Sequence, residues 1–407
     1  MADIIFGLDI GTTKVCAVVG EVRDEQLQII GLGVTPSRGM RKGMVVDVQE
    51  ASVAVAKAVE LAEQTSGYDL REALVSMAGE HISCLNTRGV TAIGRDSKGI
   101  NMTDVEYALA AAQNIPIPHN REIVHVIPRE YQVDDQKGVR NPIGMHAYKL
   151  EVEAHIVTGS SPALLNLGQC AANVDVSAEA FVLNVLASAE AVLSTNEREM
   201  DVIVADIGGG TTDIAIYRQG SVWHTKVLAV GGYHVTNDIA IGLRAPYEVA
   251  EKVKIQHGDC RPQEIDAETV FTVEPFGGEK IQVGQQDLAY VIEARVEEIF
   301  QLILKEIKNS GYDGLLTAGI VLTGGAAQLN GITTVAERVL NMPARVGSPV
   351  NLLGLVDRLN SPAYATSVGL LRWMISGYNA YRPRTSRPSR RFGRVGFSNI
   401  LRALLPE

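Results

Sequence analysis

The chain reads Leu8-Asp9-Ile10-Gly11-Thr12-Thr13-Lys14-Val15 near its N-terminus and Ala205-Asp206-Ile207-Gly208-Gly209-Gly210-Thr211-Thr212-Asp213-Ile214 near its middle. Each copy places apolar β-formers first, then Asp-Ile-Gly, a Thr-Thr pair and further apolar residues, which predicts a strand, a tight turn and a second strand. Glycines in such a turn let backbone N–H groups approach an anion, and the threonine hydroxyls can donate to it. The two copies together predict two similar lobes that bind one polyphosphate between them.

A third element lies further along the chain than the second copy, towards the C-terminus. Residues 320–329 form an apolar run that predicts a buried strand, and its Gly324-Gly325 turn is expected to open a helix. Such a turn can pack its backbone against a flat base and a ribose. The sequence has no Gly-x-x-x-x-Gly-Lys-[Ser/Thr] motif and no Gly-x-Gly-x-x-Gly after an N-terminal strand, which argues against phosphate-loop and dinucleotide-binding folds.

Length and composition indicate a soluble protein with several subdomains. The 407 residues are 46% hydrophobic and 21% charged, and this length suits about two to four subdomains. No apolar stretch reaches the roughly 18–20 residues that a membrane span requires, and we expect no signal peptide because the N-terminus enters a strand at once. The cysteines lack metal-binding or disulfide spacing, so free thiols are expected at Cys16, Cys84, Cys170 and Cys260.

Hydrophobic periodicity predicts an α/β chain with one inserted unit. We expect body strands at 3–10, 14–21, 27–34, 73–78 and 222–230, and body helices at 49–66, 162–172, 178–193, 234–241, 246–257, 288–308 and 362–374. The stretch 263–283 is expected to be β-rich. A small α+β insertion is predicted between the strand at 73–78 and the helix at 162–172. It would contain strands at 83–93, 122–133 and 149–158 and a helix at 103–114, with Thr103 as the N-cap and Glu106 completing a capping box.

The C-terminal residues differ sharply from the body in charge. Residues 378–407 contain seven arginines and one acid, which is a formal charge of +6, so the net charge of −10 leaves −16 on residues 1–377. The segment 378–394 is rich in Arg, Pro and Ser and predicts a basic linker. An acidic body of this kind is expected to have no nucleic-acid partner.

The last residues have the pattern of an amphipathic helix. One helical face of residues 395–407 carries Phe397, Ile400, Leu401, Leu404 and Leu405, and Arg402 lies among them. One interpretation is a helix that packs on the protein's own core; the other, which we favour because a linker precedes it, is a helix that lies on an anionic membrane. Burial of the five side chains contributes about 7–15 kcal/mol, ordering the segment costs about as much, and each arginine adds about 1 kcal/mol. A single tail should therefore bind weakly, and several tails on one assembly should bind firmly.

The two hairpins and the glycine turn, in this order, resemble the actin/DnaK-type chaperone/sugar-kinase superfamily of two-lobed ATP-binding α/β folds. Together with the insertion and the amphipathic C-terminus, they resemble one family closely, the FtsA family of bacterial actin-like cell-division proteins. The resemblance runs from end to end, and the stretches that carry it are 7–19, 39–47, 79–93, 206–216, 231–240, 319–331 and 367–371.

The resemblance implies a division into subdomains. Subdomain 1A would comprise 1–82, 163–195 and 362–377; subdomain 1C, which replaces one actin subdomain, would be 83–162. Subdomain 2A would comprise 196–244 and 318–361, and subdomain 2B would be 245–317. The resemblance further implies a protein that polymerises, binds the C-terminal tail of the tubulin-like FtsZ through 2B, anchors it to the cytoplasmic face of the inner membrane at the division septum, and recruits later division proteins through 83–162.

The same resemblance implies ATP and Mg²⁺ as cofactors and assigns the residues that hold them. The first turn would contribute Asp9, Gly11, Thr12, Thr13 and Lys14, and the second would contribute Asp206, Gly208, Gly209, Gly210, Thr211 and Thr212. The two aspartates would orient metal-bound waters, because Mg²⁺ keeps much of its hydration shell. Ribose and base would contact Gly232, Glu251, Lys254, Gly324, Gly325 and Ala326; the alternative for Glu251 and Lys254 is a solvated helix face.

Hydrolysis of ATP is expected to be slow or negligible. DnaK-type chaperones place a glutamate just before an Ala-rich helix ahead of the second hairpin, and in this sequence Leu186 takes that place, with Glu190 one turn further on. A steady turnover above about one per minute would contradict this expectation. No other catalytic residue stands out.

Arg295, on the long helix predicted at 288–308, is a candidate contact for the acidic FtsZ tail. The alternative is that it is solvated or paired with Glu298 or Glu293. A small-molecule kinase of the same superfold is the rival function, but neither a carboxylate base nor a polar sugar pocket can be identified. A pilus-assembly scaffold of similar fold would lack the amphipathic tail, and a chaperone would require a substrate-binding domain after the body.

Overall fold

The computed structural model describes residues 3–23, 26–94 and 99–376, and these form two lobes, each built on one sheet. The first sheet has the order β11-β6-β1-β2-β3-β19 and the second β14-β13-β12-β17-β18. In both sheets a meander of three antiparallel strands is followed by two parallel strands, so β3-β2-β1-β6-β11 corresponds to β14-β13-β12-β17-β18. The two sequence copies thus occupy equivalent hairpins, β1–β2 and β12–β13, as predicted.

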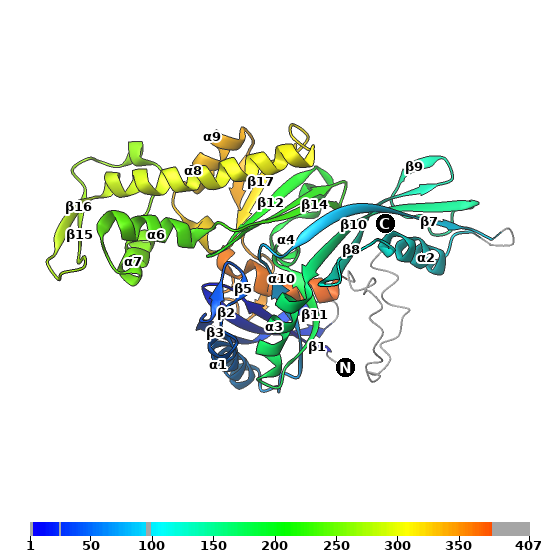
Figure 1. The fold of residues 1–407 in the computed structure, drawn as a ribbon, viewed down its shortest axis with the longest axis horizontal. Coiled ribbons are helices and arrows are strands. Elements are labelled where there is room, and N and C mark those ends of the chain that lie inside the picture. Colours follow the sequence, from blue (N-terminus) through cyan, green and yellow to red (C-terminus); the bar gives the residue numbers. More distant parts are fainter. Residues whose placement is uncertain (1–2, 24–25, 95–98, 377–407) are drawn as a thin grey trace.

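The first lobe lies at the bottom of Figure 1 and contains the first strand and the last helix that the structure describes. Its strands are β1 (Asp3–Ile10), β2 (Lys14–Arg23), β3 (Gln26–Pro36), β6 (Glu72–Met77), β11 (Ser177–Leu183) and β19 (Leu353–Gly354), beside a small hairpin of β4 (Met40–Arg41) and β5 (Met44–Val45). Its helices are α1 (Val48–Ser66), α3 (Ser161–Ala172), α4 (Asn184–Val192) and α10 (Ala365–Ile375), which follows a 3₁₀ turn at Pro362–Tyr364.

The second lobe carries the long helix α8 along the top of Figure 1. Its strands are β12 (Val202–Ile207), β13 (Thr212–Arg218), β14 (Ser221–Leu228), β17 (Ile320–Thr323) and β18 (Ala344–Val346), with a separate hairpin of β15 (Val270–Val273) and β16 (Ile281–Gly284). Its helices are α5 (Thr195–Glu199), α6 (Gly232–Leu243), α7 (Tyr247–His257), α8 (Gln285–Ser310) and α9 (Ile332–Leu340), with 3₁₀ turns at Pro262–Glu264 and Gly325–Gln328.

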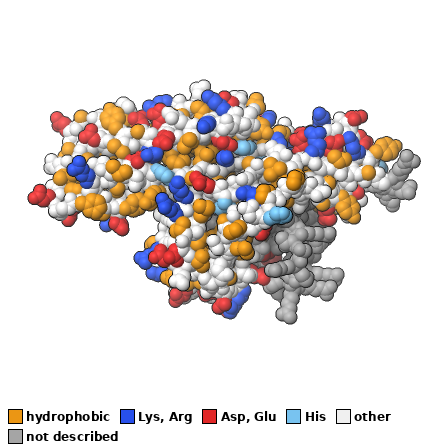
Figure 2. Space-filling view, in the orientation of Figure 1, with side chains coloured by type: hydrophobic (Ala, Val, Ile, Leu, Met, Phe, Trp, Pro, Cys, Tyr) orange, Lys and Arg blue, Asp and Glu red, His pale blue; other side chains and the backbone are white. Residues whose placement is uncertain are grey.

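The insertion is a four-stranded sheet of order β7-β10-β8-β9 that extends to the right in Figure 1. It comprises β7 (Ser83–Ala92), α2 (Met102–Gln113), β8 (Arg121–Val133), β9 (Gln136–Val139) and β10 (Lys149–Ser160). Figure 2 shows acidic and basic side chains side by side over this sheet, and ion pairs there join Arg88 to Glu153 and Lys149 to Glu151. The visible face is therefore mixed in charge.

The described residues bury three hydrophobic clusters. The first fills the first lobe and continues onto strands β12, β13, β14 and β17 of the second lobe, the second fills the rest of the second lobe, and the third fills the insertion. Helix α8 illustrates how sequence period produces burial, because its buried apolar residues recur every three or four positions, at Leu288, Ile292, Val296, Ile299, Ile303 and Ile307. None of the helices in the part of the chain that the structure describes is both long and apolar enough to span a bilayer.

Two sequence predictions about helices are wrong. Residues 178–183 form strand β11, because this apolar stretch pairs in parallel with β6 and tertiary pairing overrides local helix propensity. The N-cap of α2 is Asn101, whose side chain accepts from the backbone N–H groups of Thr103 and Asp104, while Asp104 accepts from the Asn101 N–H at 2.9 Å. Thr103 and Glu106 therefore lie inside the helix. The predicted linker and amphipathic helix lie outside the described residues.

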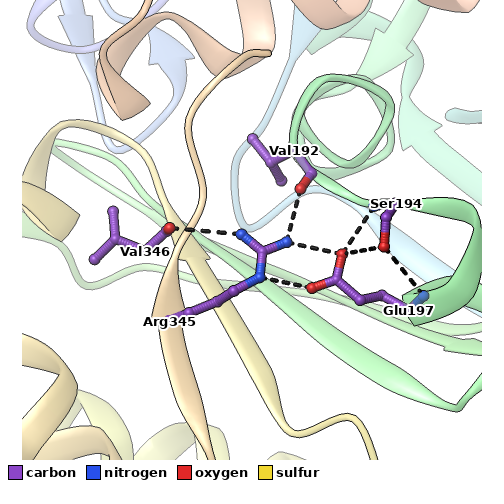
Figure 3. A network of polar contacts seen from close by, with 5 residues as sticks. All are labelled: Val192, Ser194, Glu197, Arg345 and Val346. Carbon is purple, nitrogen blue, oxygen red and sulfur yellow. Dashed lines mark hydrogen bonds and ion pairs between the residues drawn. The ribbon is translucent and has the colours of Figure 1, made fainter.

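Arg345 on β18 forms an ion pair with Glu197 on α5 and a hydrogen bond with the last residue of α4 in the first lobe (Figure 3). Arg345 contacts both carboxylate oxygens of Glu197, at 2.6 and 2.8 Å, and donates to the carbonyl of Val192 at 2.9 Å. Glu197 also accepts from the backbone N–H and hydroxyl of Ser194. Burial alone would raise the pKa of Glu197, but these hydrogen bonds outweigh it and lower the pKa to about 2.

Candidate functional site

A cavity of about 580 Å³ lies between the two lobes, at the turns of both hairpins. This cavity is lined by nearly all the residues that the sequence assigned to the site: Asp9, Gly11, Thr12, Thr13, Lys14, Asp206, Gly208, Gly209, Gly210, Thr211, Gly232, Glu251, Lys254, Gly324, Gly325 and Ala326. Long-range contacts thus bring five separated stretches of sequence to one place.

Each hairpin turn is closed by the same backbone hydrogen bond. Gly11 N–H donates to the Lys14 carbonyl at 3.0 Å, and Gly208 N–H donates to the Thr211 carbonyl at 2.9 Å. Helix α6 begins directly against the second turn, because Gly232 N–H donates to the Gly208 carbonyl at 2.9 Å. The turns therefore hold their backbone in fixed positions around the cavity.

The two turns touch one another across the lobe boundary. A Cβ atom on Gly209 would lie 2.1 Å from Oγ1 of Thr13, and one on Gly210 would lie 2.7 Å from Oγ1 of Thr12. Neither distance is possible for a real side chain, so the lobes approach this closely only because these residues are glycines.

Asp9, near the end of β1, and Asp206, near the end of β12, are buried and accept hydrogen bonds from hydroxyl groups. Asp9 accepts from Ser76 at 2.8 Å and from Ser367 at 2.9 Å. Asp206 accepts from Thr366 at 2.9 Å. Burial raises the pKa of Asp206, although the hydrogen bond from Thr366 opposes this effect.

Asp213 pairs with Asp206 across the β12–β13 hairpin and is also buried. Its Oδ2 accepts from Thr211 at 2.9 Å, whereas its Oδ1 is buried without a hydrogen-bond partner. Burial and the charge of Asp206 raise the pKa of Asp213 well above its ordinary value, which favours its neutral form. The structure does not bring Asp213 to the cavity wall.

Lys14 is held on the first lobe at the edge of the cavity. Its ammonium donates to the carbonyl of Ala363 and lies 5.0 Å from the centroid of the Tyr364 ring.

Gly324 lies at the cavity wall in the second lobe. It has a φ of +85°, and a Cβ atom there would lie 2.4 Å from Oδ1 of Asp206. Only glycine adopts this conformation at so close an approach.

Glu251 and Lys254 on α7 do not form a solvated helix face. Lys254 donates to Glu251 at 2.7 Å and to the hydroxyl of Thr236 on α6 at 2.8 Å. Thr236 in turn donates to Glu251. Beside them the rings of Tyr233 and Tyr247 stack at 4.8 Å, and burial raises the pKa of Tyr247 to about 12. This network fixes the cavity wall that α6 and α7 share.

Thr212 belongs to the predicted set but does not line the cavity. It is the first residue of β13, it is fully buried, and its hydroxyl donates to the Val230 carbonyl at 2.8 Å. Thr211, the residue before β13, lies in the turn and lines the cavity. Thr212 therefore supports the sheet instead of facing the cavity.

The residue at the start of α4 that faces the cavity is Asn184, which the sequence analysis did not identify. Its side-chain oxygen is buried without a hydrogen-bond partner. Leu186 is fully buried in the core of the first lobe, and Glu190 pairs with Arg198 at 2.6 Å outside the cavity. The signal that could have identified Asn184 is its place as the first residue of the Ala-rich helix.

Sequence reasoning missed further residues of the cavity wall, most of which lie outside the three motifs. The missed residues are Ile10, Gly43, Ala78, Asn184, Tyr233, Tyr247, Ile255, Gly258, Gln328, Leu329, Asn330, Ala363 and Thr366. Tyr233 directly follows the Gly231-Gly232 pair, which was a usable signal. Among the described residues, no group of three or more His, Cys, Asp or Glu side chains could hold a metal ion by direct ligation.

Arg295 lies on α8 and is paired. It donates to Asp238 on α6 at 2.5 and 3.0 Å and to Glu298 at 2.5 Å. The pairing with Glu298 is the alternative that the sequence had left open, and Asp238 was not anticipated. Hydrogen bonding to Asp238 raises the pKa of Arg295, so it remains a cation.

The solved structures similar to this chain share its fold. The PilM-PilN type IV pilus biogenesis complex matches with a TM-score of 0.65 and 15% identity, covering 90% of this chain and 97% of the other. MreB5 of Spiroplasma citri bound to ADP matches with a TM-score of 0.54 and 15% identity, covering 93% of this chain and 99% of the other. The predicted actin-like fold is confirmed.

Sequence comparisons identify the family. A family model described as cell division protein FtsA matches residues 203–369, and one described as the SHS2 domain inserted in FTSA matches residues 79–158. The cell division protein FtsA of Pseudomonas aeruginosa is 41% identical over 372 residues, covering 91% of this chain and 89% of the relative. That of Bacillus subtilis is 39% identical over 372 residues, covering 91% and 83%. The chain therefore belongs to the FtsA family of cell division proteins.

Proposed function

We propose that this chain is an ATP-binding, actin-like division protein that forms filaments, tethers FtsZ to the inner membrane at the septum, and recruits later division proteins. The observation that carries the proposal is the cavity between the lobes, which both Asp-Ile-Gly turns line in a chain of the FtsA family. Calorimetric titration with ATP and Mg²⁺ tests its central element. We expect one molecule of ATP per chain, and the absence of binding would refute the proposal.

The residues present fit a nucleotide polyphosphate. Glycines at 208, 209 and 210 leave the turn without side chains, the buried oxygen of Asn184 lacks a partner at the cavity wall, and Lys14 supplies a cation. The related fold of MreB5 from Spiroplasma citri was solved with ADP and with AMPPNP. Under this proposal the two turns and Lys14 hold the phosphates, while Gly232, Glu251, Lys254 and the turn at Gly324, Gly325 and Ala326 hold the nucleoside.

The residues also fit a magnesium ion bound through water. Asp9 and Asp206 are two carboxylates at one cavity, and Mg²⁺ in nucleotide sites keeps several waters and needs few direct protein ligands. When bound, the ion neutralises phosphate charge. The two carboxylates orient its waters, and the hydroxyls of Ser76, Ser367 and Thr366 hold those carboxylates in place.

The proposed slow hydrolysis of ATP is supported by the residues at the cavity wall near the start of α4. Asn184 carries an amide, which cannot accept a proton from water as a carboxylate can, and Glu190 is engaged by Arg198 outside the cavity. The protein would then act as a nucleotide-dependent scaffold, with filament assembly through the lobes and the insertion at 83–162 as a docking unit for later division proteins.

Residues 395–407 are proposed to place the filament on anionic lipid, peripherally and at the cytoplasmic face. Sedimentation with phosphatidylglycerol vesicles should carry the full chain down, whereas a chain lacking residues 393–407 should stay in solution. Phosphatidylcholine vesicles are the control for charge. If the shortened chain still binds the anionic vesicles, the membrane role of this segment is refuted.

Arg295 is the proposed contact for the acidic FtsZ tail within 245–317. Because Asp238 and Glu298 already neutralise it, the tail must compete with Asp238. Arg295→Glu should abolish binding of an FtsZ C-terminal peptide and leave ATP binding intact, and Asp238→Asn should strengthen peptide binding. A swapped pair, Arg295→Asp with Asp238→Arg, preserves the ion pair and controls for folding. Unchanged peptide affinity in Arg295→Glu would exclude this residue.

A further inference from the structure

Two adjacent residues of α10 each hold one of the two cavity aspartates. The hydroxyl of Thr366 donates to Oδ2 of Asp206 at 2.9 Å, and the hydroxyl of Ser367 donates to Oδ2 of Asp9 at 2.9 Å. Asp9 is the next-to-last residue of β1 in the first lobe, and Asp206 is the next-to-last residue of β12 in the second. A single turn of helix is thus hydrogen-bonded to both lobes.

Helix α10 itself belongs to the first lobe. Its apolar residues Val368, Leu370 and Leu371 are buried in the core that also holds β1, β2 and α4. The Thr366 contact is therefore a bond from the first lobe to the second, whereas the Ser367 contact stays within the first. The carbonyl of Pro362, just before α10, adds a second link by accepting from Gly324 N–H at 3.2 Å.

Both hydroxyls and both carboxylates are largely buried, and Asp9, Asp206 and Thr366 lie at the cavity wall. Ser367 is fully buried and Thr366 is 7% exposed, while Asp9 and Asp206 are 4% and 6% exposed. The remaining oxygen of Asp9 accepts from Ser76, so both of its oxygens are fixed by protein donors. A largely buried carboxylate that loses one of its donors is less restrained, so each hydroxyl helps to determine where its carboxylate points.

We infer that Thr366 and Ser367 are positioning residues that set the distance and orientation between Asp9 and Asp206, and thereby the preference of the cavity for magnesium-bound over metal-free nucleotide. This inference rests on the proposed function. Groups that orient metal-site carboxylates typically change metal affinity by about 10–100-fold when removed. Mg²⁺ is sensitive to such changes because it demands near-ideal octahedral geometry.

The test measures the equilibrium affinity for a fluorescent ATP analogue by anisotropy, in EDTA and across a magnesium titration. The variants are Thr366→Val, which keeps the shape of the side chain without its hydroxyl, and Ser367→Ala. Thr366→Ser keeps the hydroxyl and is the conservative variant. Thr35→Val is the matched control, because Thr35 is equally buried and donates to the Ala54 carbonyl at 3.0 Å, away from the cavity. Thermal melts establish that each variant is folded.

We expect Thr366→Val and Ser367→Ala to weaken magnesium-dependent binding by about 10-fold or more, with affinity in EDTA nearly unchanged. Thr366→Ser and Thr35→Val should match the wild type. The inference is overturned if both variants that lack a hydroxyl, Thr366→Val and Ser367→Ala, keep the wild-type magnesium dependence. It is also overturned if they weaken nucleotide binding equally in EDTA and in magnesium. If the wild type binds no nucleotide in either condition, the proposed function fails and the inference falls with it. If either Thr366→Val or Ser367→Ala does not fold, the other variant still tests the inference, because each hydroxyl holds a different carboxylate.

Discussion

The guanidinium carbon of Arg129 lies 4.0 Å from the centroid of the Trp223 ring. Arg129 is on β8 of the insertion and Trp223 is on β14 of the second lobe. Arg129 also donates to the hydroxyl of Tyr312, which follows α8, at 2.9 Å. Although the insertion interrupts the chain of the first lobe, it is thereby packed against the second, so movement of one lobe relative to the other must strain or displace this contact.

Arg129→Ala should lower the free energy of unfolding by about 2–4 kcal/mol, because it removes a desolvated cation–π contact and a charged hydrogen bond. Only 7% of the Arg129 side chain is exposed. Denaturant titration followed by tryptophan fluorescence measures the change. Arg88→Ala is the control: its side chain is 56% exposed, so a loss of less than about 1 kcal/mol is expected. If the two variants lose the same free energy of unfolding, the buried contact of Arg129 does not stabilise the fold as proposed.

Gly209→Ala should abolish nucleotide binding, because the new methyl group would collide with the Thr13 hydroxyl at 2.1 Å and force the lobes apart. Thr13→Ala removes that hydroxyl and, combined with Gly209→Ala, should restore part of the affinity. Calorimetric titration with ATP provides the measurement. Gly242→Ala, with no atom near its Cβ position, should bind normally. A double variant no better than Gly209→Ala would show that the collision is not the cause.

Asn184→Glu should raise the rate of ATP hydrolysis by about 10-fold or more, because a carboxylate at this wall can accept a proton from an attacking water. Asn184→Gln has the same side-chain length without the charge and should leave the rate low. Phosphate release under saturating ATP and Mg²⁺ is the measurement. Equal rates in the two variants would mean that the wall at Asn184 does not face the reacting water.

The ion pair between Arg345 and Glu197 should make stability depend on pH in the acid range. The pKa of Glu197 is about 2 in the folded chain against 4.5 ordinarily, so folding favours the ionised form. Its contribution is complete above pH 4.5 and is lost as the pH falls through about 2. Glu197→Gln should cost about 1 kcal/mol at pH 7, a value that allows for solvent screening at this partly exposed pair.

Urea unfolding of the wild type and Glu197→Gln at several pH values from 7 downwards tests this dependence. The difference between the two should shrink as the pH falls below about 4.5 towards 2. Glu264→Gln, at a more exposed pair with Arg261, should show a smaller difference throughout. A gap for Glu197→Gln that stays constant with pH would contradict the role assigned to its carboxylate.

Much of the fold and of the candidate site could be predicted because it is written in local patterns. The apolar β-forming runs around Asp9 and Asp206 predicted both hairpins, and the period of α8 predicted its buried face. Glycine turns are equally local, since a tight turn depends on the conformations of a few neighbouring residues. The residues of the three motifs line one cavity, with Thr212 as the exception.

By itself the sequence determined most of the strands, helices and glycine turns, because these depend on spacing along the chain. Only the tertiary structure decided that 178–183 pairs with β6 as a strand, that Asn184 and not Leu186 faces the cavity, and that Arg295 binds Asp238. It also decided that neighbouring hydroxyls at Thr366 and Ser367 meet aspartates from different lobes. Those contacts join residues far apart in the chain, and their geometry exists only once the sheets and helices have packed.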